Sequence, residues 1–285
     1  MSMKEITIEL PHTRLQALRW GEGGHIVLAL HGWLDNAMSF APLAPYLVDE
    51  NTSLIALEFA GHGHSEHRPL NSGYHFSDHM RDVMFAVEAL GIEKIDIIGH
   101  SLGAIAISML AGVYPGRFRR LVCIECYGPP YVSDHHNLPQ AMAERLLELD
   151  YTQSRASKVY PRLESLVQAR IQAGKMDEES ARLLMARNVE EVPGGWRFRS
   201  DKRLTLGQPL MMSESQVMEF LERIQAPVLM IEGQQGFVPH WPHFRARYEK
   251  TPRLELVSLP GGHHLHMDAP ESVARAIRDF WAATP

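Results

Sequence analysis

The sequence lacks the features that mark several common classes of protein. It has no basic excess, because 28 Lys and Arg stand against 34 Asp and Glu, for a net charge of −6. Nucleic acid is therefore not an expected partner. No apolar run approaches the roughly 18 to 20 residues of a membrane span, and Lys4 and Glu5 stand where a secretory signal would be apolar. We expect a cytoplasmic protein without a membrane partner.

Cysteine is also scarce. The only two, Cys123 and Cys126, form a C-x-x-C spacing within the stretch LVCIECY. Redox-active pairs of this spacing lie at the start of a helix, whereas this stretch has the character of a strand, in which positions three apart point to opposite faces. The pair is interpreted as ordinary core cysteines.

What the sequence does contain is a series of apolar runs of strand length, each followed by turn residues and a helical pattern. Runs that are apolar on both faces and alternate with helices indicate a parallel sheet covered on both sides. The N-terminal stretch MSMKEITIEL also alternates like a strand. The runs are HIVLALHG (25–32), SLIALEFAG (53–61), KIDIIGHS (94–101), RLVCIECYG (120–128), PVLMIEG (227–233) and RLELVSLPG (253–261).

Residues 129–212 interrupt this rhythm. Helical patterns occur at 161–174 and 177–189, with no convincing buried strand between them. We therefore expect a helical cap at 129–212, inserted into a core made of residues 1–128 and 213–285. In the second part of that core, Ser213 and Gln216 fit a capping box and Pro270 fits the first turn of a helix.

The stretch IDIIGHSLGA (95–104) contains G-x-S-x-G at the end of an apolar strand and at the start of a helix rich in small residues. In this context the serine lies on a strained strand-to-helix turn, and glycines on both sides allow helix and strand to approach closely. Ser101 is thus predicted to be a nucleophile. The alternative, a helix-capping serine, fits the surrounding pattern less well.

A serine nucleophile requires donors for the negative oxygen that forms during the reaction. The backbone N–H of Leu102, directly after the serine, is one expected donor. The second should come from the loop after an earlier strand, where HGW (31–33) places the N–H of Trp33. A plain turn with a buried Trp is the alternative interpretation.

The nucleophile also requires a base and an acid. The stretch GGHHLHMDAPE offers His263, His264 and His266 as bases. The acid is harder to place, because Gly236 stands three residues after Gly233, where an aspartate would be expected.

Glu125 can replace that aspartate. It ends the strand that follows the nucleophile helix, and a right-handed crossover sets this strand beside the nucleophile strand. A buried charge also requires a partner. Glu232 and Asp201 are weaker candidates, and the absence of any functional acid is a further alternative.

Four stretches in this order, HGWLDNAMSF, EFAGHGHSEHRP, IIGHSLGA and GGHHLHMDAPE, resemble the α/β-hydrolase fold superfamily, and most closely its serine hydrolase-like (Kraken-related) branch. The resemblance runs from about residue 15 to the C-terminus. It implies that His263, directly after the glycine, is the base. It also agrees with Glu125 as the acid, because related hydrolases carry their acid after this strand.

Two other patterns compete with this interpretation. GHGHSEH (61–67) approaches the zinc-binding spacing of metallo-β-lactamase-like proteins, but that fold has two β-sheets and the other patterns indicate a parallel sheet. Glu58, just before this stretch, could be catalytic. Acceptance of backbone N–H bonds from the following turn is the favoured role for its carboxylate.

The sequence therefore predicts an α/β-hydrolase with a helical cap that hydrolyses a small carboxylic ester through an acyl-enzyme, without a cofactor or metal. Its aromatic residues suggest an apolar acyl or aromatic group on the substrate. The alternatives are C–C bond hydrolysis, perhydrolysis or cofactor-free oxygenation on the same fold, or a slow-turnover receptor. The residues expected to line the substrate pocket are His31, His100, Tyr127 and Phe237.

Overall fold

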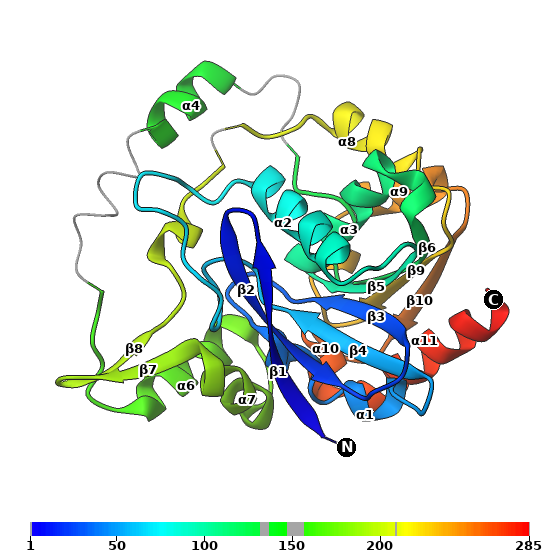
Figure 1. Ribbon diagram of the computed structural model, residues 1–285. Coiled ribbons are helices and arrows are strands. Elements are labelled where there is room, and N and C mark those ends of the chain that lie inside the picture. The colour runs from blue at the N-terminus through cyan, green and yellow to red at the C-terminus, as the bar shows by residue number, and fades with distance from the viewer. Residues whose placement is uncertain (1, 132–136, 147–156, 209, 285) are drawn as a thin grey trace.

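A single eight-stranded sheet forms the centre of the molecule (Figure 1). The computed structural model describes residues 2–131, 137–146, 157–208 and 210–284. The strand order is β1-β2-β4-β3-β5-β6-β9-β10. The strands are β1 (Met3–Leu10), β2 (Thr13–Trp20), β3 (His25–Leu30), β4 (Thr52–Leu57), β5 (Ile95–His100), β6 (Phe118–Ile124), β9 (Val228–Gly233) and β10 (Leu254–Leu259).

The six strands from β4 to β10 run parallel, and the hairpin β1-β2 joins β4 in antiparallel fashion. The predicted parallel sheet is thus confirmed, and all six predicted runs form strands. The N-terminal strand is also present as β1, whereas β2 was not predicted. Because the carboxyl ends of parallel strands share one edge, the loops after β3, β5, β6, β9 and β10 meet there.

Helices cover both faces of the sheet, and each face has its own apolar core. One face packs against α2 (Phe76–Ala89), α3 (Leu102–Val113), α8 (Glu214–Leu221) and α9 (His243–Lys250). The other packs against α1 (Ala44–Leu47) and α11 (Pro270–Ala283), and Figure 1 shows these two groups on opposite sides of the strands. This layering explains why the parallel strands are apolar on both faces.

Two helix starts agree with the sequence signals. Ser213 caps α8, where its side chain accepts from the Gln216 amide while the Gln216 side chain accepts from the Ser213 amide. Pro270 is the first residue of α11, a position that needs no backbone donor. Each signal marks the first residues of an amphipathic helix. The two signals therefore fix where these helices, which pack against the sheet, begin.

The segment 129–212 lies between β6 and β9, and its described residues add no strand to the main sheet. It contains α4 (Leu138–Leu146), α6 (Leu163–Gly174), α7 (Glu178–Asn188) and the short 3-10 helix η3 (Lys202–Thr205). It also contains a hairpin, β7 (Val189–Val192) and β8 (Gly195–Phe198), which the sequence did not indicate. Parts of it, 132–136, 147–156 and 209, lie outside the described residues. The division into core and cap remains a prediction.

Among the residues that the structure describes, none of the helices has the length and apolar character needed to cross a membrane.

Candidate active site

Ser101 lies on a tight turn between β5 and α3. Its backbone has φ 50° and ψ −112°, a left-handed conformation that costs about 1 to 3 kcal/mol in a non-glycine residue. The turn is held by a 2.9 Å bond from the Ser101 amide to the carbonyl of Ile124. Gly99 and Gly103 make it possible, because a Cβ on Gly103 would collide with the Leu30 carbonyl and one on Gly99 would lie 2.5 Å from the amide of Ala104.

Glu125 follows β6 directly and is fully buried. Its backbone is also left-handed, with φ 57°, and its amide donates to the carbonyl of Ile231 at 2.9 Å. Each carboxylate oxygen has a partner: Oε1 accepts from the Gly233 amide at 2.6 Å, and Oε2 lies 3.1 Å from Nδ1 of His263. This acid is therefore anchored to the neighbouring strand and faces the imidazole.

His263 is the histidine that contacts Glu125, and it also lines the same cavity as Ser101. Burial lowers the pKa of its imidazole, and the hydrogen bond with Glu125 offsets part of that effect. A partly buried imidazole that is neutral and oriented through Nδ1 has a lone pair available on Nε2 for a proton from the serine.

The other two candidate bases have different partners. His266 is fully buried, its Nε2 lies 2.7 Å from the Ser39 hydroxyl, and burial holds the pKa of its imidazole well below the usual value. His264 lies beside Asp35, with its Nδ1 3.2 Å from the carbonyl of Gly174. The geometry thus separates His263 from its neighbours, which the sequence could separate only through the family resemblance.

The two expected oxyanion donors come from neighbouring loops. A 3.1 Å bond from the Gly103 amide to the His31 carbonyl joins the start of α3 to the loop after β3, which carries Trp33. Within the described part of the chain, neither the Trp33 amide nor the Leu102 amide donates to another protein group. The Trp33 indole is half exposed and donates to the carbonyl of Leu204 at 2.9 Å. Neither amide is therefore committed to a protein acceptor, as an oxyanion donor requires.

A cavity of about 710 Å³ contains the nucleophile and the base. Of the expected pocket residues, His100 and Phe237 line it, and the Phe237 ring centroid lies 4.4 Å from that of His263. His31 and Tyr127 are not among the residues that line it, because their side chains have partners elsewhere. The His31 imidazole lies 2.7 Å from the carbonyl of Gly32 and accepts from the Phe59 amide at 3.2 Å, and the Tyr127 hydroxyl lies 2.9 Å from the hydroxyl of Thr251.

The other candidate acids are held elsewhere. Glu232 is buried and pairs with Arg245 at 3.1 Å. Asp201 caps η3 and pairs with Arg203 at 2.6 Å. Among the described residues neither contacts a histidine of the loop that carries His263.

Glu58 has the structural role that its position predicted. Its Oε2 accepts from the amide of His64 at 2.7 Å, within the turn that follows. The sequence did not indicate its second partner, Arg187 of α7, whose guanidinium lies 2.6 and 3.0 Å from the two carboxylate oxygens. Arg187 also pairs with Glu5 of β1, so it links the segment 129–212 to the sheet.

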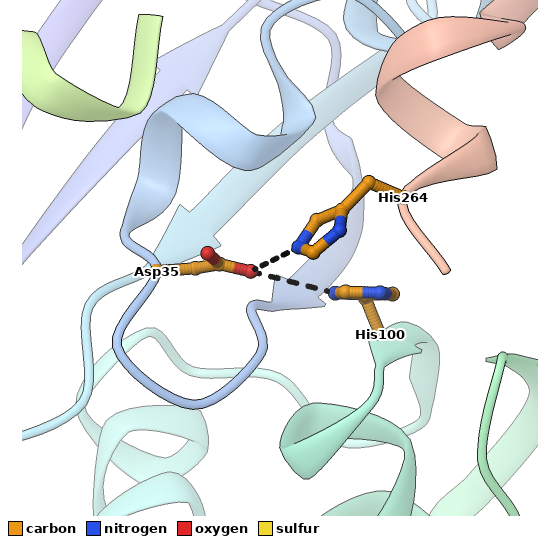
Figure 2. Close-up of side chains that lie close together, drawn as sticks. All are labelled: Asp35, His100 and His264. Atoms are coloured by element: carbon orange, nitrogen blue, oxygen red, sulfur yellow. Dashed lines mark ion pairs between the residues drawn. The ribbon is translucent and has the colours of Figure 1, made fainter. Parts of the chain in front are cut away.

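The sequence also gave no indication of a second polar cluster beside the nucleophile, shown in Figure 2. Asp35 lies with its carboxylate between His100 and His264, and Arg170 of α6 pairs with it. Burial alone would raise the pKa of Asp35, but the positive charge of Arg170 holds it well below the usual range. The residues come from four separate segments, which no spacing along the chain could connect.

A model of the α/β-hydrolase fold family matches residues 25–270. The chain belongs to this family. A "Serine hydrolase-like protein" of Danio rerio is 30% identical over 97% of this chain and 87% of its own length. A crystal structure of a hypothetical protein from Pseudomonas aeruginosa PAO1 is 41% identical, with a TM-score of 0.92 over 98% of this chain and 99% of that chain. "Esterase YbfF" of Escherichia coli (strain K12) is 24% identical over 89% of this chain and 92% of its own length. Fold and relatives together support an α/β-hydrolase enzyme of the serine hydrolase-like branch.

Proposed function

We propose that this enzyme hydrolyses small carboxylic esters through an acyl-enzyme. Ser101 is the nucleophile, His263 the base, and Glu125 the acid that orients the base. The observation that carries the proposal is the position of the Glu125 carboxylate, with one oxygen fixed by the Gly233 amide and the other 3.1 Å from His263 Nδ1. A carboxylate held at both oxygens fixes the tautomer that the base requires.

The proposed reaction has two steps. In the first, His263 removes the proton from the Ser101 hydroxyl as the oxygen attacks the ester carbonyl, and the same imidazole then gives the proton to the departing alcohol. In the second, water attacks the acyl-enzyme with His263 again as base, and the imidazole then gives that proton to the Ser101 oxygen as the acid product leaves. The Trp33 and Leu102 amides donate to the carbonyl oxygen when it is negative.

An apolar acyl or aromatic group on the substrate is supported by a second cavity of about 510 Å³. It shares Leu34, Arg170 and Ala173 with the cavity that contains Ser101, so the two adjoin at α6. Apolar side chains such as Met185 contribute to its lining. Burial of an alkyl chain there would contribute about 0.8 kcal/mol per methylene group. The proposed partner is accordingly a small molecule, and the proposed compartment is the cytoplasm.

The experiment that tests the proposal is a screen with 4-nitrophenyl esters of increasing acyl length, followed by rapid mixing with the best substrate. We expect a burst of nitrophenol close to one per active site, slower steady turnover, and loss of both in Ser101→Ala. Tight binding of the esters without turnover would instead favour a receptor, and turnover that persists in Ser101→Ala would exclude the acyl-enzyme.

A further inference from the structure

Asp35, His100 and His264 bring three metal-binding atoms together beside the catalytic residues (Figure 2). Asp35 Oδ2 lies 3.6 Å from His100 Nδ1 and 3.5 Å from His264 Nε2, and all three atoms lie within 4.8 Å of one another. The side chains are 1%, 0% and 3% exposed, respectively. The cluster is therefore buried, and it includes none of the histidines of GHGHSEH, the stretch whose spacing approaches a zinc-binding pattern.

The hydrogen bonds of the two imidazoles determine which ring nitrogens carry hydrogen. His100 Nε2 lies 2.8 Å from the carbonyl of His263, and His264 Nδ1 lies 3.2 Å from the carbonyl of Gly174. A carbonyl oxygen only accepts, so each of these nitrogens is the donor and the opposite nitrogen of each neutral ring presents a lone pair. Both lone pairs then face Asp35 Oδ2, which is itself only an acceptor.

This leaves acceptor atoms facing one another with no hydrogen between them. In the described structure Asp35 Oδ2 and His100 Nδ1 are buried without a hydrogen-bond partner. Unsatisfied polar atoms are rare in protein interiors and call for a physical explanation. A bound cation satisfies all three atoms at once. An imidazole that donates its other N–H to a backbone carbonyl is also the usual arrangement of a metal-binding histidine.

We propose that Asp35 Oδ2, His100 Nδ1 and His264 Nε2 bind a divalent transition-metal ion, preferentially Zn²⁺. Ligands at 2.0 to 2.1 Å in a tetrahedral zinc site are about 3.4 Å apart, close to the two separations from Asp35. All three residues line the cavity that contains Ser101, so an ion can enter there and water can complete its coordination. Gly32 leaves room beside the atoms, since a Cβ there would lie 2.8 Å from Asp35 Oδ2 and 2.9 Å from His100 Nδ1.

Arg170 competes with the ion. Its Nη2 pairs with Asp35 Oδ1 and lies 3.2 Å from His264 Nε2, so it occupies one of the three lone pairs. Metal binding must displace the guanidinium from His264 and overcome its positive charge. The ion would then link the loops that carry Asp35, His100 and His264, and this should stabilise the folded protein.

The test is metal binding to the full chain, purified without a histidine tag and stripped with a chelator. We expect about one Zn²⁺ per chain by titration calorimetry, a visible Co²⁺ spectrum that Zn²⁺ displaces, and a Zn²⁺-dependent rise in melting temperature. His264→Gln should weaken Zn²⁺ binding at least about 100-fold. The matched control is His67→Gln, which changes an exposed histidine of GHGHSEH and should leave binding unchanged.

A second variant tests whether Arg170 competes with the ion, and it leaves all three proposed metal-binding side chains in place. Arg170→Gln should tighten Zn²⁺ binding, because the guanidinium no longer opposes the ion. Absence of binding in the wild type, equal affinity in His264→Gln, loss of binding in His67→Gln, or weaker binding in Arg170→Gln would each overturn the proposal. None of these measurements uses turnover, so their outcome is independent of the proposed esterase activity.

Discussion

Gly236 leaves open the space that the Glu125 carboxylate fills. A Cβ on Gly236 would lie within 2.5 Å of the carboxyl carbon and both oxygens of Glu125. An aspartate at the usual position and a glutamate at 125 therefore exclude each other. The glycine at position 236 and the buried glutamate at position 125 are therefore linked, because the first leaves room for the carboxylate of the second.

Because the two carboxylates exclude each other, the effects of substitutions at positions 125 and 236 on ester turnover should depend on one another. Gly236→Asp alone should lower ester turnover, because its side chain collides with the Glu125 carboxylate. The double variant Glu125→Gly/Gly236→Asp should recover part of the activity, since glycine suits the φ of 57° at position 125 and the carboxylate moves to the later strand. Turnover of both variants and of Glu125→Gly should be measured. A double variant less active than either single one would contradict the exclusion.

Glu125→Gln should lower kcat about 10⁴-fold, because the amide no longer stabilises the positive charge on His263 and can favour the wrong tautomer. Glu232→Gln is the matched control: it is another buried glutamate at the end of a strand, but it pairs with Arg245. The control should keep near-normal kcat, and circular dichroism should show that both variants are folded. Similar activity in the two variants would remove Glu125 from the mechanism.

The pH dependence of kcat/KM should report the base. Since burial lowers the pKa of His263, the neutral form persists below the usual imidazole value, and activity should fall on acidification only below about pH 6.5. Glu125 raises this pKa through its hydrogen bond, so Glu125→Gln should move the acid limb to still lower pH. A limb at higher pH in the variant would show that the two side chains do not interact as described.

The ion pair between Arg187 and Glu58 should contribute to stability. Arg187→Ala leaves a fully buried carboxylate without its countercharge and should cost about 3 kcal/mol of unfolding free energy. Glu5→Gln weakens the contacts of a 45% exposed side chain with Arg187 and with the exposed His64, and should cost less than about 1 kcal/mol. Urea denaturation compares the two variants. Equal losses would contradict the dominance of the buried pair.

The sequence predicted those parts of the structure that depend on local pattern. The six parallel strands, the turn at Ser101 and the capping box at Ser213 are all signalled by residues close to one another in the chain. Strand β2 (TRLQALRW) was missed because residues on both of its faces are buried, which removes the alternation that identifies a strand. The short hairpin β7-β8 is half-buried except at the exposed Glu191, and it equally lacks an alternation of buried and exposed residues.

Prediction of the active site from the sequence has the same limit, because it depends on local pattern. The sequence indicated Glu125 because a charge that ends an apolar strand requires a partner. It could not indicate Asp35 with Arg170, which are 135 residues apart and meet only through packing of α6. The pocket roles expected for His31 and Tyr127 failed for a similar reason, because the direction in which a side chain points after a strand depends on tertiary contacts.

The most direct test of the proposed mechanism is labelling with a fluorophosphonate, followed by mass spectrometry of the digested protein. The account predicts one phosphonyl group per chain, on Ser101, with a rate that falls sharply in Glu125→Gln and stays near normal in Glu232→Gln. Labelling at another residue, or an unchanged rate in Glu125→Gln, would contradict it.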